Sequence, residues 1–534
     1  MLENLFIKLI NYRYVNIYIY IIIMVEKLPI ELILYSFKIA NLQTLLTLGR
    51  TCSEFNIITT DILRNRTSLS HTKKGRSRTS KAAPTVKLRF IIPSDEIRLD
   101  VIYTHLDWLS SVIIECPRNI DLMLIEQLAT KFPHRLCIFD YAIKPISNSH
   151  TLNLSRRETI TDVSALCGLY TLNLTRCIDV TDVSPLRSLH TLDLFCCTAV
   201  TDVRSLGNLH TLSLKECRKV TDVSSLGCLH TLNLTRCIDL TNVSALGELH
   251  TLNLYGCGSV TNVGALGRLH TLDLSHCRAV TDVSALGGLH TLDLFCCTAV
   301  TDVSCLGGLH TLNLKGCRLV TDVSALIDLY TLNLMNCINV TDVSALGGIH
   351  NLSLRNCFKM TDVSALGRIH KLDLSGCTGV TDVSSLGRLH TLDLSSCSNV
   401  TDVSSLGGLN TLDLSLYGAV TNVSSLGRLD KLDLSYCVSV TDVSALGGLG
   451  KLDLSYCIAV TDVSALGGLH TLNLSYCVAV TDVSDLGGLH TLNLSYCVAV
   501  TDVSALGGLH TINLSGCKAV TDVSALRNVQ TLNL

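Results

Sequence analysis

The sequence has little charge. Only 16% of its 534 residues are charged, and the formal net charge is −3, whereas an average soluble domain carries about 25% charged residues. This composition excludes a disordered, highly charged tail protein. A pI near 6.6 also gives no sign of the basic face that nonspecific nucleic-acid binding requires. We therefore expect the macromolecular partners to be proteins and not nucleic acids.

Long apolar runs are also missing, although the mean hydropathy is +0.40. From residue 149 onward, Thr, Asp, Ser and His interrupt every apolar run, and a spanning helix needs about 20 apolar residues. Residues 1–24 form an apolar leader, but Lys8, Asn11, Arg13 and Asn16 interrupt it and no small-residue cleavage site follows it. We interpret the leader as disordered or non-native, with translation starting at Met24; a signal anchor is the alternative. No membrane span is expected.

Enzyme signatures are missing as well. The sequence contains no P-loop, no glycine-rich dinucleotide motif behind a strand, no nucleophile elbow and no Cys/His set with zinc spacing. We therefore expect a binding protein without catalytic residues, cofactor or metal. An enzyme is a distant alternative that would need its acidic residues to bind a metal.

A twenty-residue repeat fills most of the chain. The unit L-H-T-L-[ND]-L-S-x-C-x-x-V-T-D-V-S-x-L-G-x recurs without a change of length across 149–534, and its strand core appears 20 times. In T-L-[ND]-L-S the period is two, which predicts a strand with Leu on one face and polar residues on the other. Seven apolar positions in each coil are expected to face inward, in one coil Leu169, Leu172, Leu174, Cys177, Val180, Val183 and Leu186.

The cysteines follow the same repeat. Seventeen of the 25 occupy one position, from Cys177 to Cys517 in steps of 20, with Tyr417 as the exception. Such spacing predicts one buried side chain per coil and no disulfide framework. Neighbouring coils would hold the thiols roughly 4.8 Å apart, beyond the roughly 3.8 Å between the Cβ atoms of a disulfide. A reducing compartment is expected.

The repeat resembles the leucine-rich-repeat family. The family signature L-x-x-L-x-L-x-x-N/C-x-L is met by Leu169, Leu172, Leu174, Cys177 and Val180, with one extra residue before the last. The resemblance implies an α/β solenoid with a parallel sheet on its concave face and short 3₁₀ turns on its convex face. In the motif T-D-V-S, the Asp is expected to accept backbone N–H groups where the 3₁₀ turn starts, since Asn replaces it at 242, 262 and 422.

Residues 25–63 contain two amphipathic helical patterns and resemble an F-box. The motif residues are Leu28, Pro29, Glu31, Leu32, Leu45, Leu48 and Phe55. The resemblance implies that these residues dock onto the Skp-type adaptor of a cullin-RING ubiquitin ligase, whereas a small helical cap is the alternative. F-box/leucine-rich-repeat proteins occur in eukaryotes and in large DNA viruses, and the leader and near-copy repeats resemble the viral type.

Two segments join these parts. Residues 64–85 form a basic linker, and a nuclear signal is the alternative interpretation of its Lys and Arg residues. Residues 86–148 predict an irregular N-terminal cap with degenerate repeats, comprising strands at 86–92, 112–116 and 135–141 and a helix at 120–132. We expect the protein in the cytoplasm, the host cytoplasm for a viral protein, with the nucleus as the alternative.

Three columns of side chains are candidate functional residues. An acidic column on the concave strands, with Lys371, Lys431 and Lys451 beside it, predicts either a patch for a basic partner or mutual neutralisation. A tyrosine column predicts a protein interface. Fourteen of 18 His share one position, from His150 to His510, and we expect them to pack beside the strands, with a metal or catalytic role as the alternative. The predicted target-binding residues are Asp373, Asp393, Asp413, Asp433, Asp453, Tyr436, Tyr456, Tyr476 and Tyr496.

Overall fold

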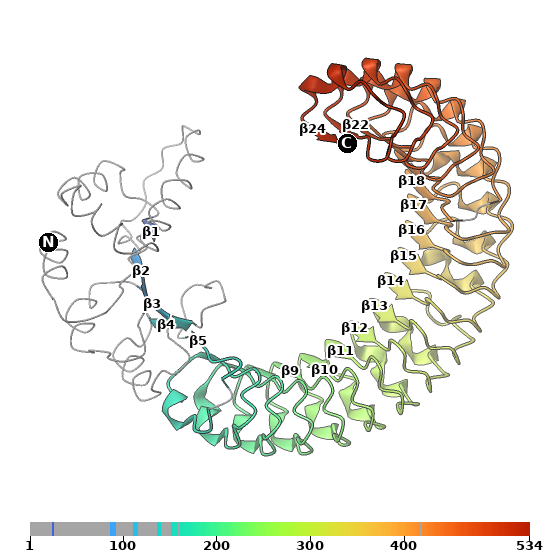
Figure 1. Cartoon of the computed structure of the whole chain (residues 1–534). Helices are drawn as coiled ribbons and strands as arrows, with labels where there is room; N and C mark the ends of the chain where they lie inside the picture. Colours follow the sequence, from blue (N-terminus) through green and yellow to red (C-terminus); the bar gives the residue numbers. More distant parts are fainter. Residues whose placement is uncertain are drawn as a thin grey trace, which may run out of the picture. The chain divides into compact units, whose positions relative to one another are not determined.

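The computed structural model describes residues 151–157, 160–416 and 419–534, together with the backbone of four strands nearer the N-terminus (Figure 1). The chain divides into two compact units, Met1–Lys219 and Val220–Leu534. The predicted linker at 64–85 and the predicted helix at 120–132 lie outside the described residues. The predicted adaptor-binding residues also lie outside them, namely Leu28, Pro29, Glu31, Leu32, Leu45, Leu48 and Phe55.

Each coil of the array begins with a three-residue strand. In the first unit these strands are β5 (Thr151–Asn153), β6 (Thr171–Asn173), β7 (Thr191–Asp193) and β8 (Thr211–Ser213). In the second unit they are β9 (Thr231–Asn233), β10 (Thr251–Asn253), β11 (Thr271–Asp273), β12 (Thr291–Asp293), β13 (Thr311–Asn313), β14 (Thr331–Asn333), β15 (Asn351–Ser353), β16 (Lys371–Asp373), β17 (Thr391–Asp393), β18 (Thr411–Asp413), β19 (Lys431–Asp433), β20 (Lys451–Asp453), β21 (Thr471–Asn473), β22 (Thr491–Asn493), β23 (Thr511–Asn513) and β24 (Thr531–Asn533). The predicted 20 strands are thus all present.

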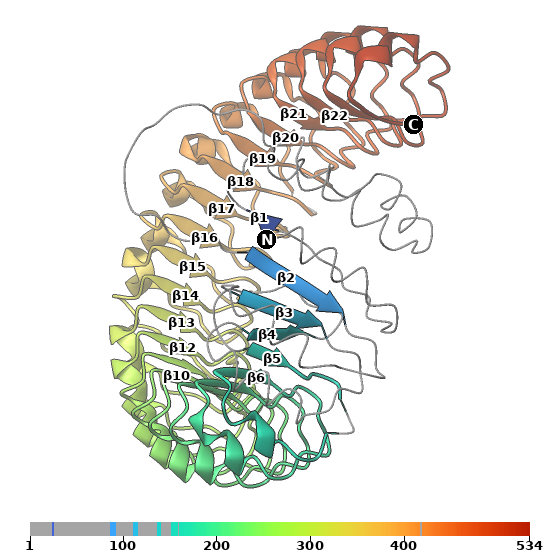
Figure 2. The same ribbon diagram turned by 90° about the vertical axis from the view of Figure 1, so that its left-hand side faces the viewer.

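Within each unit, consecutive strands of the repeat array pair in parallel with a register of one repeat. Leu252 of β10 lies opposite Leu272 of β11, which lies opposite Leu292 of β12. Figure 2 shows the strands of the second unit as successive arrows pointing the same way. The middle residue of each strand from β5 to β23 is buried and its two neighbours are more exposed, as the period of two predicts. The twenty-residue coil is therefore confirmed.

The first unit has additional strands before the repeats. Strands β2 (Val86–Ile91), β3 (Ser111–Glu115) and β4 (Leu136–Phe139) pair in parallel with one another, and β4 pairs with β5. The three strands predicted before residue 149 are therefore confirmed to within two residues at either end. Strand β1 (Met24–Val25) pairs antiparallel with β2. These two residues, predicted to belong to a leader and the start of a helical domain, are instead a strand because backbone pairing with β2 satisfies their polar groups.

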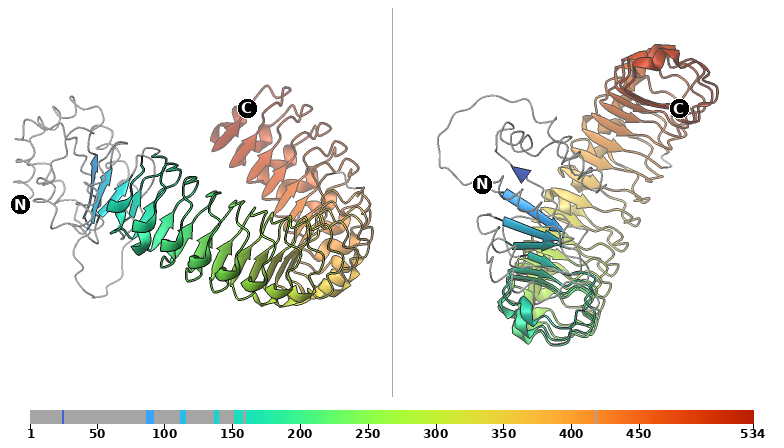
Figure 3. Two further views of the ribbon diagram at one scale, coloured as in Figure 1. Left: turned by 90° about the horizontal axis from the view of Figure 1, so that it is seen from below. Right: turned by 60° about the vertical axis from the view of Figure 1, so that its left-hand side comes forward.

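Short 3₁₀ turns lie on the side of the coils opposite the strands (Figure 3), except between β13 and β14, where the equivalent residues form ordinary turns. Nine turns have three residues, namely η1 (Ser164–Leu166), η3 (Arg204–Leu206), η4 (Ser224–Leu226), η5 (Ser244–Leu246), η6 (Gly264–Leu266), η10 (Ser364–Leu366), η11 (Ser384–Leu386), η13 (Ser424–Leu426) and η14 (Ser444–Leu446). Nine have five, namely η2 (Ser184–Ser188), η7 (Ser284–Gly288), η8 (Ser304–Gly308), η9 (Ser344–Gly348), η12 (Ser404–Gly408), η15 (Ser464–Gly468), η16 (Ser484–Gly488), η17 (Ser504–Gly508) and η18 (Ser524–Asn528). Parallel strands with 3₁₀ turns on the opposite side fit a leucine-rich-repeat solenoid.

The core consists of the predicted apolar positions. In the coil from Leu169 to Leu186, all seven of them are at most 6% exposed. The cysteine is buried in every described coil in which it occurs. In most of these coils its thiol donates a hydrogen bond to the carbonyl of a Leu 23 residues earlier, for example from Cys277 Sγ to Leu254 O at 3.1 Å. No disulfide joins the described cysteines. Burial raises the pKa of Cys277 to about 12, so the thiol stays protonated and keeps its hydrogen bond.

Candidate binding surfaces

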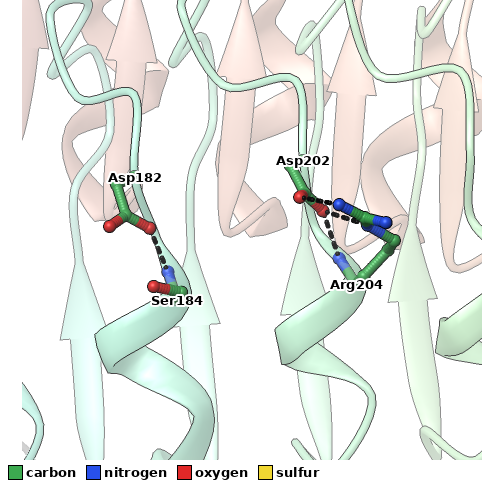
Figure 4. A network of polar contacts seen from close by, with 4 residues as sticks. All are labelled: Asp182, Ser184, Asp202 and Arg204. Carbon is green, nitrogen blue, oxygen red and sulfur yellow. Dashed lines mark hydrogen bonds and ion pairs between the residues drawn. The ribbon is translucent and has the colours of Figure 1, made fainter.

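The Asp of each T-D-V-S motif has a structural role. Asp182 Oδ1 accepts the backbone N–H of Ser184 at 2.8 Å (Figure 4), and hydrogen bonds from Ser184 lower the pKa of Asp182. Asp202 makes the same contact with Arg204 and also an ion pair at 2.7 Å. Asn242 keeps the backbone contact, accepting from Ser244 at 3.0 Å. The predicted backbone-capping role is confirmed, because the bond survives when the charge is lost.

The carboxylates of the acidic column on the concave strands also accept backbone hydrogen bonds, here at the ends of the strands. Each of its carboxylates accepts the backbone N–H of the serine two residues later, at 2.8–3.0 Å. This structural role was not predicted. One carboxylate oxygen of each side chain is thus hydrogen-bonded to the turn that follows its own strand. The residues are Asp373, Asp393, Asp413, Asp433 and Asp453.

Within the part of the array that the structure describes, the second carboxylate oxygen, Oδ2, has a hydrogen-bond partner in a neighbouring coil at the two ends of this column but not in its middle. Asp373 Oδ2 accepts from Ser353 Oγ at 2.9 Å, and Asp453 Oδ2 accepts from Asn473 Nδ2 at 2.8 Å. Across the described coils, no such bond from a neighbouring coil reaches the three middle carboxylates, and Lys371, Lys431 and Lys451 form no ion pair with the column. Burial and the adjacent carboxylates raise the pKa values of Asp413 and Asp433. In these coils the lysines thus make no direct ion pair with the column, although the charge of Lys451 favours the ionised form of Asp433. Recognition of a basic partner stays a prediction.

Replacing Asp413 by Asn should stabilise the protein. A folded-state pKa above the unfolded value of 3.8 means that the ionised carboxylate costs stability at neutral pH. Asn keeps the acceptor and gains a donor for a neighbouring Asp, as Asn473 does. We expect a gain in unfolding free energy of up to about 1 kcal/mol, measured by urea denaturation at pH 7.

The matched control is Asp402→Asn on the other side of the coil. Hydrogen bonds from Ser404 lower the pKa of Asp402, so its charge stabilises the fold and the substitution should bring no gain. A loss of stability in Asp413→Asn would contradict the interpretation of the column as electrostatically strained.

The histidines form stacks beside the strands, as predicted. The rings of His250 and His270 lie 4.6 Å apart at 10°, and those of His270 and His290 lie 4.6 Å apart at 9°. Nδ1 of His270 lies 3.2 Å from Thr271 Oγ1. Nearly parallel rings do not aim their nitrogens at a common point, as a metal site requires. Among the described residues, no group of three or more His, Cys, Asp or Glu side chains could hold a metal ion.

Acid should destabilise the array through these stacks. Partial removal from water, and then the charges of His230 and His270, lower the pKa of His250 below its ordinary 6.5. The unfolded chain therefore takes up protons first as the pH falls. The stability linked to neutral His is present above about pH 6.5 and is lost as the pH falls through the folded-state pKa. We expect a lower Tm at about pH 5 than at neutral pH by calorimetry.

The control replaces His250, His270 and His290 by Asn, which the chain itself carries at the equivalent position 410. The drop in Tm between the two pH values should shrink in this variant. Equal Tm values for the unmodified protein at both pH values would contradict the prediction.

The predicted tyrosine column is a continuous stack. Ring centroids are 4.2 Å apart between Tyr436 and Tyr456, 4.3 Å between Tyr456 and Tyr476, and 4.5 Å between Tyr476 and Tyr496. The stack ends at Gly516, where an added Cβ would lie 2.7 Å from the Tyr496 ring. Both faces of each inner ring are covered, so the column presents ring edges and hydroxyl groups. Shielding from water and the neighbouring phenols raise the pKa of Tyr456 to about 12.

The tyrosines also share a backbone conformation that the sequence analysis missed. Their φ angles are 60–63°, in the left-handed region, which most residues with a side chain avoid. The equivalent residue has a positive φ in every described coil, and it is Gly at 256, 316, 376 and 516. Gly at these four equivalent positions is the feature of the sequence from which the left-handed conformation could have been predicted.

A second row, of aliphatic side chains, accompanies the tyrosines and was also missed. Val438, Ile458, Val478 and Val498 are 43–51% exposed, each two residues after a Tyr. Exposed apolar side chains gathered in one place are characteristic of interaction sites, whereas isolated ones are common on any surface. The structure thus places an exposed aliphatic residue near each tyrosine. The acidic column shares only the coils of Asp433 and Asp453 with the tyrosines, and its other members lie in the preceding coils.

Comparisons with known proteins give little further information. No protein-family model and no curated protein matches the sequence. Among solved structures, the chain is similar to the functional domain of InlJ from Listeria monocytogenes, which includes a cysteine ladder. The two are 20% identical over 71% of this chain and 70% of that one, with a TM-score of 0.26. A likeness this low carries no argument about function, and the fold assignment rests on the coils themselves.

No helix in the part of the chain that the structure describes is both long and apolar enough to cross a bilayer.

Proposed function

We propose that the repeat array is a protein-binding surface and that the chain has no catalytic activity. The observation that carries the proposal is the stack of four tyrosines, whose rings repeat every 4.2–4.5 Å on a rigid ladder of coils. Stacking fixes the rings before a partner arrives, so little side-chain entropy is lost on binding. Tyr is also a residue type that frequently dominates binding energy. The concave acidic column adds charge for a basic region of the same partner.

The test compares two sets of Ser substitutions at the same turn position. One replaces Tyr436, Tyr456, Tyr476 and Tyr496, and the matched control replaces Asn336 and Asn356. Ser396 already occupies this position with φ 60°, so both variants should fold. A photo-crosslinker at Ala479 would identify the bound protein in a cell extract. We expect its recovery to fall at least about tenfold in the Tyr variant only; unchanged recovery would remove the tyrosines from the site.

We further propose that residues 25–63 link the array to a ubiquitin ligase. The support is the F-box-like order of Leu28, Pro29, Glu31 and Leu32 followed by Leu45, Leu48 and Phe55. In this arrangement the array selects a target and the N-terminal segment binds a Skp-type adaptor. The protein would act in the reducing cytoplasm, in keeping with its unbridged buried thiols.

Co-purification with the adaptor separates this proposal from its alternative, a binding scaffold without a ligase link. Binding should be lost in Leu28→Ala/Pro29→Ala and retained in Lys74→Ala, which changes the basic linker. Absence of the adaptor from the purified wild-type protein would favour the scaffold.

A further inference from the structure

The second unit carries a stripe of apolar side chains whose binding partner has not yet been named. It consists of Tyr436, Tyr456, Tyr476, Tyr496, Val438, Ile458, Val478 and Val498, and we call it the Tyr–Val stripe. Two residues of chain span at most about 7 Å, so each aliphatic residue lies within that distance of a tyrosine along the backbone of the same turn. Every aliphatic member is at least 43% exposed.

The turns that carry the stripe have no charged residue. Residues 435–440, 455–460, 475–480 and 495–500 contain only Ser, Tyr, Cys, Val, Ile and Ala. Other coils place a cation at the same position as the aliphatic row, for example Arg278, Arg318 and Lys518. Lys518 directly follows the last coil of the stripe. A surface that lacks charge complements another uncharged apolar surface, since a charge buried against it would be left unpaired.

We propose that the Tyr–Val stripe pairs two copies of this chain. The proposal names a partner for the tyrosine column and rests on that column being an interaction surface. A row repeating every 4.2–4.5 Å does not match the side chains of a single strand, which recur on one face roughly every 6.6 Å, or the 5.4 Å pitch of a helix. A second copy has the same repeat and can match the stripe coil by coil.

A two-fold axis satisfies this match. The coil of Tyr436 in one copy faces the coil of Tyr496 in the other, and the coil of Tyr456 faces that of Tyr476, so one surface serves both partners. Because stacking covers the ring faces, the aliphatic side chains of the other copy would pack against the ring edges.

The available area indicates a weak dimer. The exposed parts of the eight side chains amount to at most roughly 600 Å² per copy, given the 150–250 Å² of one aromatic residue and the partial burial of Tyr436, Tyr456 and Tyr476. Two copies would then bury on the order of 1,200 Å², at the lower end of specific interfaces. Dimerisation should therefore depend on concentration in the micromolar range.

Sedimentation equilibrium of the full chain across that range tests the proposal. Ile458→Lys/Val478→Lys puts cations into the stripe, a residue type that the array carries at 518. The matched control, Ile238→Lys/Phe358→Lys, changes the same turn position in coils without the stacked tyrosines, where these residues are 43% and 46% exposed. We expect dimerisation to weaken at least about tenfold in the first variant and less than about twofold in the control.

Two results would overturn the dimer. One is a wild-type protein that stays monomeric at every concentration; the other is a stripe variant that dimerises as well as wild type. Should the Lys variant unfold, Tyr456→Ser/Tyr476→Ser provides the same test with neutral side chains. A monomeric protein whose target capture still depends on the tyrosines would refute the dimer and leave the proposed function standing. Dimerisation without Tyr-dependent capture of a target would support the dimer and refute the tyrosines as the target-binding site.

Discussion

Replacing Leu372 by Asp should unfold the coils around β16 and split the second unit into two parts that melt separately. Leu372 is completely buried and lies in register between Leu352 and Leu392. A carboxylate there has no partner and no access to water, which places the loss of stability at about 5 kcal/mol or more. Because coils contact only their neighbours, the damage should stay local and not spread along the array.

Calorimetry and limited proteolysis would detect this behaviour. The variant should show more than one thermal transition and new cleavage sites in the coils next to residue 372. The control is His370→Asp, since the side chain is exposed and the chain carries Asp at the equivalent position 430. It should change the unfolding free energy by less than about 1 kcal/mol. A single unchanged transition for Leu372→Asp would show that this side chain is not in the core.

Replacing Cys377 by Ala should lower the unfolding free energy by about 2 kcal/mol. The thiol is completely buried and donates to Leu354 O at 3.0 Å. Its removal leaves a small cavity and a buried carbonyl with one donor fewer, and each costs about 1 kcal/mol or more. Urea denaturation of the full chain gives the measurement.

Cys228→Ala is the control, because Cys228 is exposed and its removal should change stability by less than about 0.5 kcal/mol. Equal stabilities of the two variants would mean that the cysteine column does not support the core.

The coil could be predicted from the sequence because its determinants are local and repeated. Leu172 and Leu174 alternate with polar residues, and the same alternation returns every 20 residues, so stacking consecutive coils is the arrangement that buries all of the apolar positions. The seven inward positions and the capping role of Asp182 followed from this pattern, and the structure confirms both.

The role of the concave acidic column was harder to infer. The exchange of Asp for Asn at 242, 262 and 422 correctly indicated that the side chain at this position accepts a backbone hydrogen bond. The same exchange occurs in the concave column, with Asn473, Asn493 and Asn513 after Asp453, and has the same cause. For that column we considered only a basic partner or mutual neutralisation, because side chains on the open face of a sheet normally make no hydrogen bond to the backbone.

The left-handed turn residue could not be recognised from the tyrosines themselves. Arg, Cys, Asn, Leu and Tyr all occupy it, and these types do not favour a positive φ as a group. The neighbouring coil fixes this conformation, since the N–H of Tyr436 donates to the carbonyl of Ser455 at 2.8 Å. Exposure of the aliphatic row likewise depends on the turn that follows and not on the residue type.

Thiol labelling under native conditions, read out by peptide mass spectrometry, tests the coil geometry most directly. Cysteines at the repeated position are at most 7% exposed from Cys177 to Cys517, and we expect them to stay unmodified while Cys167 and Cys228, which are exposed, react readily. Denaturant should make all of them react. Labelling of the repeated cysteines as fast as Cys167 and Cys228 in the native protein would contradict the inward-facing coil on which the binding surfaces depend.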